Sequence, residues 1–507
     1  MQFGDDARQV LKDGADKVYK AVSCTLGASG RNVSYQKFGK PRITNDGVTI
    51  ARQIELENMF ERQGAEHLKE AAEQTNREAG DGTTTSIVMA HAIFEEGLKA
   101  IKEGANPMQL RHEIEESAKK VVVELKARAI PISTPEELDF VANISVENPE
   151  IGKLVSEAVR TAGRDGNVVV EESEGYTIEK EEITGYQYDQ GWTNPYLVTN
   201  PEKMEAVMEN VPILVSNKSW NLINDFMPLL EELKGKGEDK LVIIADEISG
   251  ELLNFFVVNR LKLRFHAVIV KKPYNTEQLE DIAALTGATA ITPEKGIAIP
   301  AVSHLGKVKK AVVKEKSILI MGGGGDPSER VKEIKGQIAE AKDYDKEKLE
   351  DRLAKLLGKV VVIKVGAKTD TERKYLKLKI DDGVNAVKAA VEEGIVAGGG
   401  MTLARVAEKV LRNKETKGDE VLYMSCHKPL LKILENTGVD NSVDIVKQLS
   451  QSETSGYDAL QGKIVPDMIK QGIIDPVKVT RSAFSNAVSL AALLLTTEAV
   501  IAEIPEK

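Results

Sequence analysis

The chain has 507 residues, of which 42% are hydrophobic, 29% charged and 5% aromatic, which is the composition of a folded protein and excludes a disordered one. At roughly 150 residues per domain, this length predicts about three domains. The net charge of −11, without a long basic block, argues against a nucleic-acid partner, and no apolar stretch reaches membrane-spanning length, so we expect a cytoplasmic protein with no membrane partner.

Residues 1–127 have mainly helical periodicity. Val10, Leu11, Ala15, Val18 and Val22 recur at helical spacing and predict one apolar face. Residues 32–50, NVSYQKFGKPRITNDGVTI, contain two short strand-like runs separated by a turn. A second helix is expected after residue 81, through SIVMAHAIFEEGLKAI.

Residues 79–86, AGDGTTTS, interrupt this helical pattern. A helix that begins at the threonines would point free backbone N–H groups and its positive end out of the turn, and Gly82 would let an anion approach closely. The pattern therefore predicts a phosphate site, at which Asp81 can hold Mg²⁺. The alternative is that Asp81 or a threonine only caps the helix. The Walker-type pattern GxxxxGK[ST] is absent from the sequence, which disfavours an ordinary P-loop enzyme.

The middle of the chain has a different pattern. Pro131 and Pro135 indicate a boundary, and residues 240–247 and 266–273 are short β-branched runs on either side of a helical segment, which predicts a β-α-β unit. We place the approximate edges of this domain at Gly185 and Gly358. Ala-rich helical sequence returns from about residue 393, so the middle is expected to be an insertion that the chain enters and leaves once.

Two further aspartates have ordinary structural interpretations. Asn45-Asp46-Gly47 between strand-like runs predicts a hairpin turn. Asp382, ahead of an Ala- and Val-rich segment, is typical of a helix N-cap.

Two segments of the middle domain are more apolar than a sheet-covering helix requires. In GELLNFFVVNRL (250–261) the apolar residues point in nearly every direction around a helix, and LINDFMPLLEEL (222–233) carries an apolar stripe. Either another layer buries both segments, or they form an exposed patch that binds partners. Two cysteines and six histidines show no metal-ligand spacing, so a transition-metal site is not expected.

Five widely separated motifs resemble those of the group I chaperonins, the bacterial GroEL type: TLGASGRNV, ITNDGVTIARQIEL, AGDGTTTSIVMA, AAVEEGIVAGGG and GIIDPVKVTRSAFSNA. The resemblance runs from about residue 3 to 505. It implies a multidomain chain with a mostly α-helical equatorial ATPase domain (1–127 and 393–507), a small α/β intermediate hinge domain (128–184 and 359–392) and an inserted α/β apical domain (185–358).

The resemblance also implies an ATP site, an ATPase activity and an expected requirement for Mg²⁺ and K⁺. Asp81 is the implied metal ligand, and Asp46 and Asp382 are the implied catalytic carboxylates that orient or activate the attacking water. The implied nucleotide contacts are Thr25, Leu26, Gly27, Ala28, Asn45, Asp81, Gly82, Thr83, Thr84, Thr85, Gly399, Asp458, Ala459, Leu460 and Asp475.

The apical domain is implied to bind unfolded polypeptides and a GroES-type co-chaperonin, in a homo-oligomeric ring of seven subunits, with a second stacked ring left open. The implied polypeptide contacts are Trp192, Tyr196, Leu197, Met227, Leu230, Leu253, Val257 and Val258.

Several residues depart from the family pattern. Asn45 stands where a lysine is usual, Ala28 where a proline is usual, and Asp458 where many members have asparagine. Leu431 replaces an arginine that helps rings to stack, and the apical loop after Lys272 is shortened to PYNTEQ. Two other functions stay open: an ATP-dependent small-molecule kinase-type enzyme and a non-hydrolysing ring scaffold.

Overall fold

The computed structural model describes residues 1–37, 39–163, 166–201, 203–341 and 343–503, and the chain forms two compact units. The first contains residues 1–160, 170–180 and those from 363 onward, and the second contains residues 161–169 and 181–362. The chain thus changes unit four times. The single entry and exit expected from the sequence was wrong, because residues 161–169, which lead into β4 (Asn167–Glu172), already belong to the second unit.

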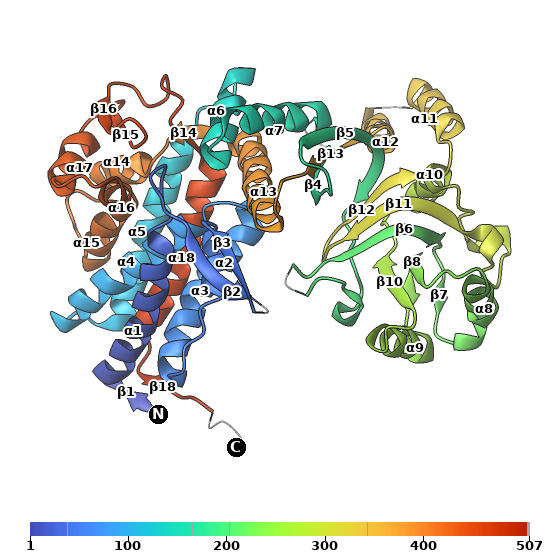
Figure 1. The fold of residues 1–507 in the computed structure, drawn as a ribbon, viewed down its shortest axis with the longest axis horizontal. Coiled ribbons are helices and arrows are strands. Elements are labelled where there is room, and N and C mark those ends of the chain that lie inside the picture. Colours follow the sequence, from blue (N-terminus) through green and yellow to red (C-terminus); the bar gives the residue numbers. More distant parts are fainter. Residues whose placement is uncertain (38, 164–165, 202, 342, 504–507) are drawn as a thin grey trace. The chain divides into compact units, whose positions relative to one another are not determined.

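The first unit is mainly helical, and its core is shared by segments from both ends of the sequence. Figure 1 shows α18 (red) beside α3, α4 and α5 (blue to cyan), and these helices are in contact. Leu11, Ala15, Val18 and Val22 are all fully buried, so the predicted apolar face of α1 is confirmed. The helices are α1 (Gly4–Ser23), α2 (Gly47–Arg52), α3 (Met59–Ala79), α4 (Thr83–Lys102), α5 (Pro107–Ala127), α6 (Pro135–Val146), α7 (Pro149–Ala162, which ends in the second unit), α13 (Asp370–Glu393), α14 (Met401–Val410), α15 (Lys417–Cys426), α16 (Lys428–Thr437), α17 (Ser442–Ser450) and α18 (Val477–Leu495).

Small two-stranded sheets complete the first unit. They pair β1 (Gln2–Phe3) with β18 (Ala499–Val500), β2 (Val33–Lys37) with β3 (Lys40–Thr44), β14 (Ile395–Ala397) with β17 (Ile474–Pro476), and β15 (Gly456–Asp458) with β16 (Lys463–Val465). The strands predicted within residues 32–50 are therefore present as β2 and β3. The predicted hairpin turn at Asp46 is wrong, because Asp46 is the N-cap of α2 and its carboxylate accepts from the Thr49 N–H at 3.0 Å.

The second unit contains most of a mixed eight-stranded sheet, in the order β10-β8-β6-β11-β12-β5-β13-β4. The predicted β-α-β unit is confirmed, because β8 and β10 pair in parallel and α9 lies between them in the chain. The elements are β5 (Ile178–Tyr188), β6 (Ala206–Val215), β7 (Ser219–Trp220), α8 (Met227–Gly235), β8 (Lys240–Ala245), β9 (Glu247–Ile248), α9 (Gly250–Leu261), β10 (His266–Lys271), α10 (Glu277–Thr286), β11 (Gly306–Val313), β12 (Ile318–Gly323), α11 (Ser328–Glu340), α12 (Asp343–Leu356) and β13 (Lys359–Val365).

Alternation along the central strands buries both faces of this sheet. In β8, Leu241 and Ile243 pack with α8 and α9, whereas Val242 and Ile244 pack with α10 on the opposite face. Helices thus cover each side of the sheet, as Figure 1 shows within this unit. Because both faces are covered there, β8 and β10 are continuous apolar runs, whereas β11 alternates apolar residues with lysines.

The predicted edges of the middle domain lie opposite each other. The N–H of Gly185, in β5, donates to the carbonyl of Gly358, just before β13, at 3.1 Å. The boundaries between the two units fall a few residues away, at 180–181 and 362–363. Within the described ranges, no helix is both long and apolar enough to cross a membrane.

Candidate functional site

The predicted turn between α3 and α4 has a left-handed glycine on each side of Asp81. Gly80 and Gly82 have φ of 68° and 81°, and α4 begins at Thr83 as expected. The N-cap of α4 is Gly82, and no side chain in the described structure caps this helix; Asp81 instead accepts from the Gly82 N–H at 2.6 Å. The capping alternative is therefore wrong, and the first N–H groups of α4 lack a side-chain acceptor.

Three segments of the first unit meet at the start of α4. The hydroxyls of Thr25 and Thr84 lie 3.3 Å apart, and Thr25 also donates to the Val22 carbonyl at 2.9 Å. A Cβ on Gly47, the first residue of α2, would lie 2.5 Å from the Thr84 hydroxyl. The close approach of α2 to α4 thus depends on glycine, and it brings Asp46 next to the turn.

The loop that follows α1 is fixed by contacts with α16 rather than with the Gly80–Gly82 turn. Asn436 donates to the carbonyls of Ser23 and Leu26, each at 2.9 Å. Gly27 has φ of 85°, and a Cβ there would lie 2.9 Å from Ile433. Leu26 and Gly27 are therefore fixed beside α16, whereas the next predicted contact, Ala28, is exposed.

Aspartates from four separate segments contribute to the electrostatics of this site. Loss of hydration, followed by the charges of Asp46 and Asp81, raises the pKa of Asp382 well above its ordinary value. Loss of hydration also raises the pKa of Asp81, against the Gly82 N–H, the charge of Lys379 and a hydrogen bond from Ser145, which lower it. Such mutual repulsion indicates a site built for a cation or for a ligand that brings one.

Asp475 is the fourth member of this carboxylate cluster. Loss of hydration and the charge of Asp81 raise the pKa of Asp475 to about 6, and the backbone N–H of Gly399 opposes this shift. Residue 475 lies in β17, opposite Val396 of β14. Asp382 lies in the middle of α13, and the N-cap of that helix is Thr369, so the predicted capping role of Asp382 is wrong.

The oxygen donors fit Mg²⁺, which binds through one or two carboxylates together with waters and phosphate oxygens. No group of three or more His, Cys, Asp or Glu side chains that could hold a metal by itself occurs in the part of the chain that the structure describes. Asp81 fits a Mg²⁺ ion that is shared with a phosphate ligand, because Mg²⁺ takes few protein carboxylates and completes its shell with waters and phosphate oxygens.

A buried lysine that the motif comparison did not include lies beside the cluster. The Lys379 ammonium is 2.7 Å from the Glu147 carboxylate, and Asn45 donates to the same oxygen at 3.4 Å. The charge of Lys379 lowers the pKa of both Asp81 and Asp382. Its position one helical turn before Asp382 was a signal in the sequence that could have identified it.

The remaining predicted nucleotide contacts line a second edge of the site. Asp458 is 8% exposed, and its carboxylate accepts from the N–H groups of Leu460 at 2.9 Å and Gln461 at 3.0 Å. Ser29 donates to the Ala459 carbonyl at 3.1 Å, which brings this loop to the loop after α1. The structure therefore brings the predicted positions together in one unit, although the Leu460 side chain is 79% exposed.

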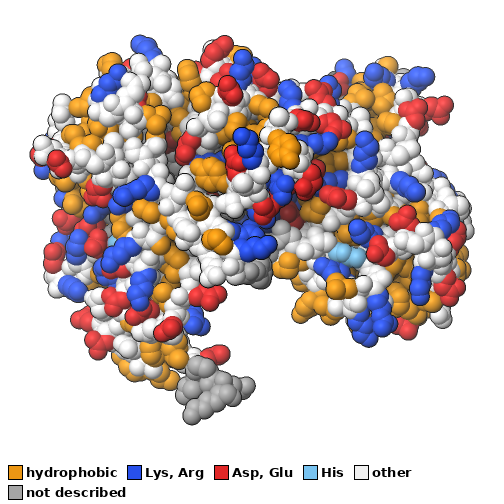
Figure 2. All heavy atoms as spheres, viewed as in Figure 1, with side chains coloured by type: hydrophobic (Ala, Val, Ile, Leu, Met, Phe, Trp, Pro, Cys, Tyr) orange, Lys and Arg blue, Asp and Glu red, His pale blue; other side chains and the backbone are white. Residues whose placement is uncertain are grey.

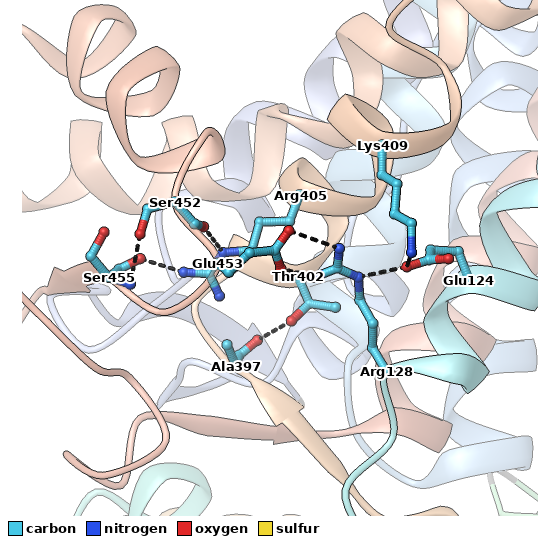
Figure 3. Close-up of polar contacts among 9 residues, drawn as sticks. All are labelled: Glu124, Arg128, Ala397, Thr402, Arg405, Lys409, Ser452, Glu453 and Ser455. Atoms are coloured by element: carbon cyan, nitrogen blue, oxygen red, sulfur yellow. Dashed lines mark hydrogen bonds and ion pairs between the residues drawn. The ribbon is translucent and has the colours of Figure 1, made fainter.

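An ion network braces the loop that leads to Asp458 (Figure 3). Arg405 of α14, 4% exposed, donates to the carbonyls of Ser452, at 2.6 Å, and Ser455. Arg128, at the end of α5, donates to Glu453 at 2.8 Å. The buried arginine thus joins α14, which follows Gly399, to the 452–458 loop.

The second unit contains the eight predicted polypeptide contacts, but they differ in exposure. Tyr196 is 67% and Val258 is 45% exposed, whereas Leu197 is fully buried and Leu230 is 8% exposed. Trp192, Met227, Leu253 and Val257 are partly exposed. Leu197 and Leu230 belong to the core under α8 and α9, so in this conformation they are not available to a partner.

Helix α9 has one buried side and one open side. Leu252 and Phe256 are fully buried, while Val258 and Leu261 are 45% and 66% exposed. Hydrophobic side chains also reach the surface of this unit in Figure 2, and on the face drawn there basic and acidic side chains are interspersed. Both interpretations of this helix thus hold in part, since the sheet buries one side and leaves an apolar strip uncovered.

Comparison with known proteins gives one family and one fold. The model of the TCP-1/cpn60 chaperonin family matches residues 18–505. Two crystal structures of the chaperonin gp146 from the bacteriophage EL 2 (Pseudomonas aeruginosa), both in the presence of ATP-BeFx, are similar to the chain. Crystal form II has a TM-score of 0.70 at 20% identity and form I a TM-score of 0.63 at 21% identity, and each match covers 100% of this chain and 99% of the phage chain.

Proposed function

The chain belongs to the TCP-1/cpn60 chaperonin family, and on this premise we propose that it is an ATP-hydrolysing chaperone that binds non-native polypeptides on its second unit. The observation that carries the proposal is the carboxylate cluster of Asp46, Asp81, Asp382 and Asp475 around the uncapped start of α4. A cluster of repelling carboxylates beside free backbone N–H groups suits a nucleotide that arrives with a divalent cation.

The start of α4 would bind the phosphates of ATP. The N–H groups and hydroxyls of Thr83, Thr84 and Thr85 donate to the phosphate oxygens, and the positive end of the helix favours their charge. Mg²⁺ held by Asp81 would neutralise charge on the phosphates and on the neighbouring carboxylates. Asp458, on the other edge of the site, and Asp475, in the carboxylate cluster, would contact the nucleoside.

Asp46 and Asp382 would act on the attacking water. As the water oxygen forms its bond to the γ-phosphorus, the bond from that phosphorus to the oxygen bridging to the β-phosphate breaks, and ADP leaves. The proton of the water passes to the carboxylate of Asp382 or Asp46. Because the environment raises the pKa of Asp382, that carboxylate is a stronger base than an ordinary aspartate once it is ionised.

The exposed strip that includes Tyr196, Val258 and Leu261 would bind the polypeptide. A patch of roughly 100 Å² contributes only about 2.5 kcal/mol at about 25 cal/mol per Å², which is too little for one subunit to hold a client. A ring of subunits presents several such patches to one chain, and multivalency then makes the binding tight. Seven subunits, one or two rings, and a GroES-type lid remain predictions, as does a requirement for K⁺.

ATP would control this binding by favouring one conformation of the chain over another. A ligand shifts a conformational equilibrium only by its difference in affinity for the two states. Asp382, on α13, would meet the γ-phosphate in one of these states only, which would tie hydrolysis to that conformation. The similar phage chaperonin crystallised in the presence of ATP-BeFx supports a nucleotide ligand for this fold.

Refolding of a denatured test enzyme, with and without ATP and a GroES-type protein, tests the proposal. We expect the chain to prevent aggregation without ATP and to release active enzyme when ATP is added. A kinase-type enzyme would instead transfer phosphate to a small acceptor, and a scaffold would bind ATP without turnover. Electron microscopy of the same sample adds a second test, because rings are expected only for a chaperonin or a ring scaffold.

A further inference from the structure

We propose that Lys379 contacts the γ-phosphate of bound ATP, and that Glu147 holds its ammonium group when the phosphate is absent. The inference rests on the proposed function, since it deepens the assignment of the same ATP site. It adds to that site a basic side chain that lies among its carboxylates.

The cluster needs a positive charge that the residue next to Asp46 does not supply. Residue 45 is the neutral Asn45, whereas the cluster has four carboxylates and would receive a triphosphate. Lys379 is 8% exposed and lies three residues before Asp382 on α13, and it binds the same Glu147 oxygen as Asn45, the neighbour of Asp46 in the chain. Its ammonium is therefore joined through Glu147 to the segment that carries Asp46 and through α13 to Asp382, the two proposed catalytic carboxylates.

The position of Lys379 on α13 couples it to Asp382. Residues three apart on a helix lie on the same face, so any movement of α13 that brings Asp382 to the phosphate brings Lys379 with it. A lysine ammonium has three donors on a flexible stem, so it can exchange one oxygen partner for another.

Glu147 has the features of an exchangeable partner. It is the C-cap of α6 with φ of 58°, and its side chain is 43% exposed, so water can solvate the carboxylate once the lysine leaves. Asn45 donates to the same Glu147 oxygen at 3.4 Å, which gives that oxygen a second donor. The 2.7 Å pair between Lys379 and Glu147 thus gives the buried ammonium a directly bonded counter-charge in the absence of nucleotide.

The competing explanation is that this ion pair only joins α6 to α13. The two explanations differ in their dependence on the γ-phosphate. A purely structural pair would support ATP and ADP binding equally, whereas a γ-phosphate contact supports ATP alone.

The test compares ATP and ADP dissociation constants, measured by calorimetry with Mg²⁺, for the wild-type chain and for Lys379→Ala. We expect ATP to bind about 10- to 100-fold more weakly to the variant, as for the loss of one charge-assisted hydrogen bond, and ADP to stay within about twofold. Lys379→Arg should recover part of the ATP affinity. Lys377→Ala is the matched control, because Lys377 is on the same helix but pairs with Glu172 at 3.9 Å, and it should leave both constants unchanged.

Glu147→Gln gives an independent answer if Lys379→Ala does not fold. Removal of the competing carboxylate should tighten ATP binding and leave ADP binding unchanged. Equal changes for the two nucleotides in either variant, or no change in ATP affinity, would overturn the inference. A wild-type chain that binds no ATP would instead refute the proposed function, so the two failures are distinguishable.

Discussion

Substitution of Asp475 by asparagine should stabilise the nucleotide-free protein while weakening its nucleotide site. Burial and Asp81 raise the folded-state pKa of Asp475 to about 6, above the ordinary 3.8. The folded state thus keeps the proton of the Asp475 carboxyl group over a pH range in which the unfolded state has lost it. Stability is therefore lost as the pH rises from about 4 to 6 and stays at the lower level above that. The asparagine side chain of the variant carries no charge, so the variant avoids this loss.

The expected change in the free energy of unfolding follows from the size of the pKa shift of Asp475. A rise from 3.8 to about 6 corresponds to at most about 3 kcal/mol at neutral pH. At pH 5 roughly half of this difference should remain, since wild-type Asp475 is then mostly protonated in the folded state. For a unit of roughly 300 residues, with about 2.1 cal/mol/K of unfolding entropy per residue, 3 kcal/mol raises Tm by roughly 5 °C.

The assay is thermal unfolding of both proteins in chelator, without nucleotide, at pH values from 5 to 8. The Tm advantage of the variant should grow with pH and level off above about 6. Asp467→Asn is a control of opposite sign, because the Lys470 N–H lowers the pKa of Asp467, so this variant should gain no stability at high pH. An Asp475→Asn variant that is less stable than the wild type at pH 8 would refute the assignment of Asp475 to a repelling cluster.

Three further outcomes are expected. Asp382→Ala should slow ATP hydrolysis at least about 100-fold while the ATP dissociation constant changes little, and normal turnover in that variant would reject the catalytic assignment. Tyr196→Ser combined with Val258→Ser should abolish suppression of aggregation with the basal ATPase intact; unchanged capture of a denatured enzyme would place the binding surface elsewhere. Arg405→Ala should raise KM for ATP by roughly tenfold, because two carbonyls of the 452–458 loop lose their donor. Arg405→Lys should be intermediate, and an unchanged KM in both would show that the loop needs no brace.

Local patterns predicted the elements of the fold better than the roles of single polar residues. The helix start at Thr83 and the parallel pair of β8 and β10 followed from glycine positions and from apolar periodicity. The sequence predicts a hairpin turn at Asp46 because Asn-Asp-Gly satisfies turn and N-cap preferences equally well, whereas in the structure its carboxylate caps α2, whose Gly47 packs against Thr84. The sequence predicts a helix start at Asp382 because the first half of α13 is polar, so its apolar pattern does not show that the helix begins after Thr369.

The site itself depended on contacts between distant segments. Spacing in the sequence gives no indication that the charge of Asp81 acts on the pKa of Asp475. Their assignment to one nucleotide site required the resemblance to the chaperonins, which the family match confirms. The sequence also does not predict which strip of α9 stays uncovered, because a helix that is apolar on all sides does not show which side the sheet covers. The burial of Leu197 and Leu230 shows the same limit, since both are as apolar as the exposed neighbours.

Helix α13 is long, so a change at one of its ends acts on residues far from that end. Its 24 residues span about 36 Å at about 1.5 Å per residue, it follows β13 after a short connection, and Asp382 lies near its middle. A rod of this length transmits a tilt applied at one end to every point along it. Substitutions at its solvated beginning, such as at Asp370 or Lys374, would therefore change the rate of ATP hydrolysis without touching the ATP site. Related chains would then differ in hydrolysis rate while their ATP contacts stay identical.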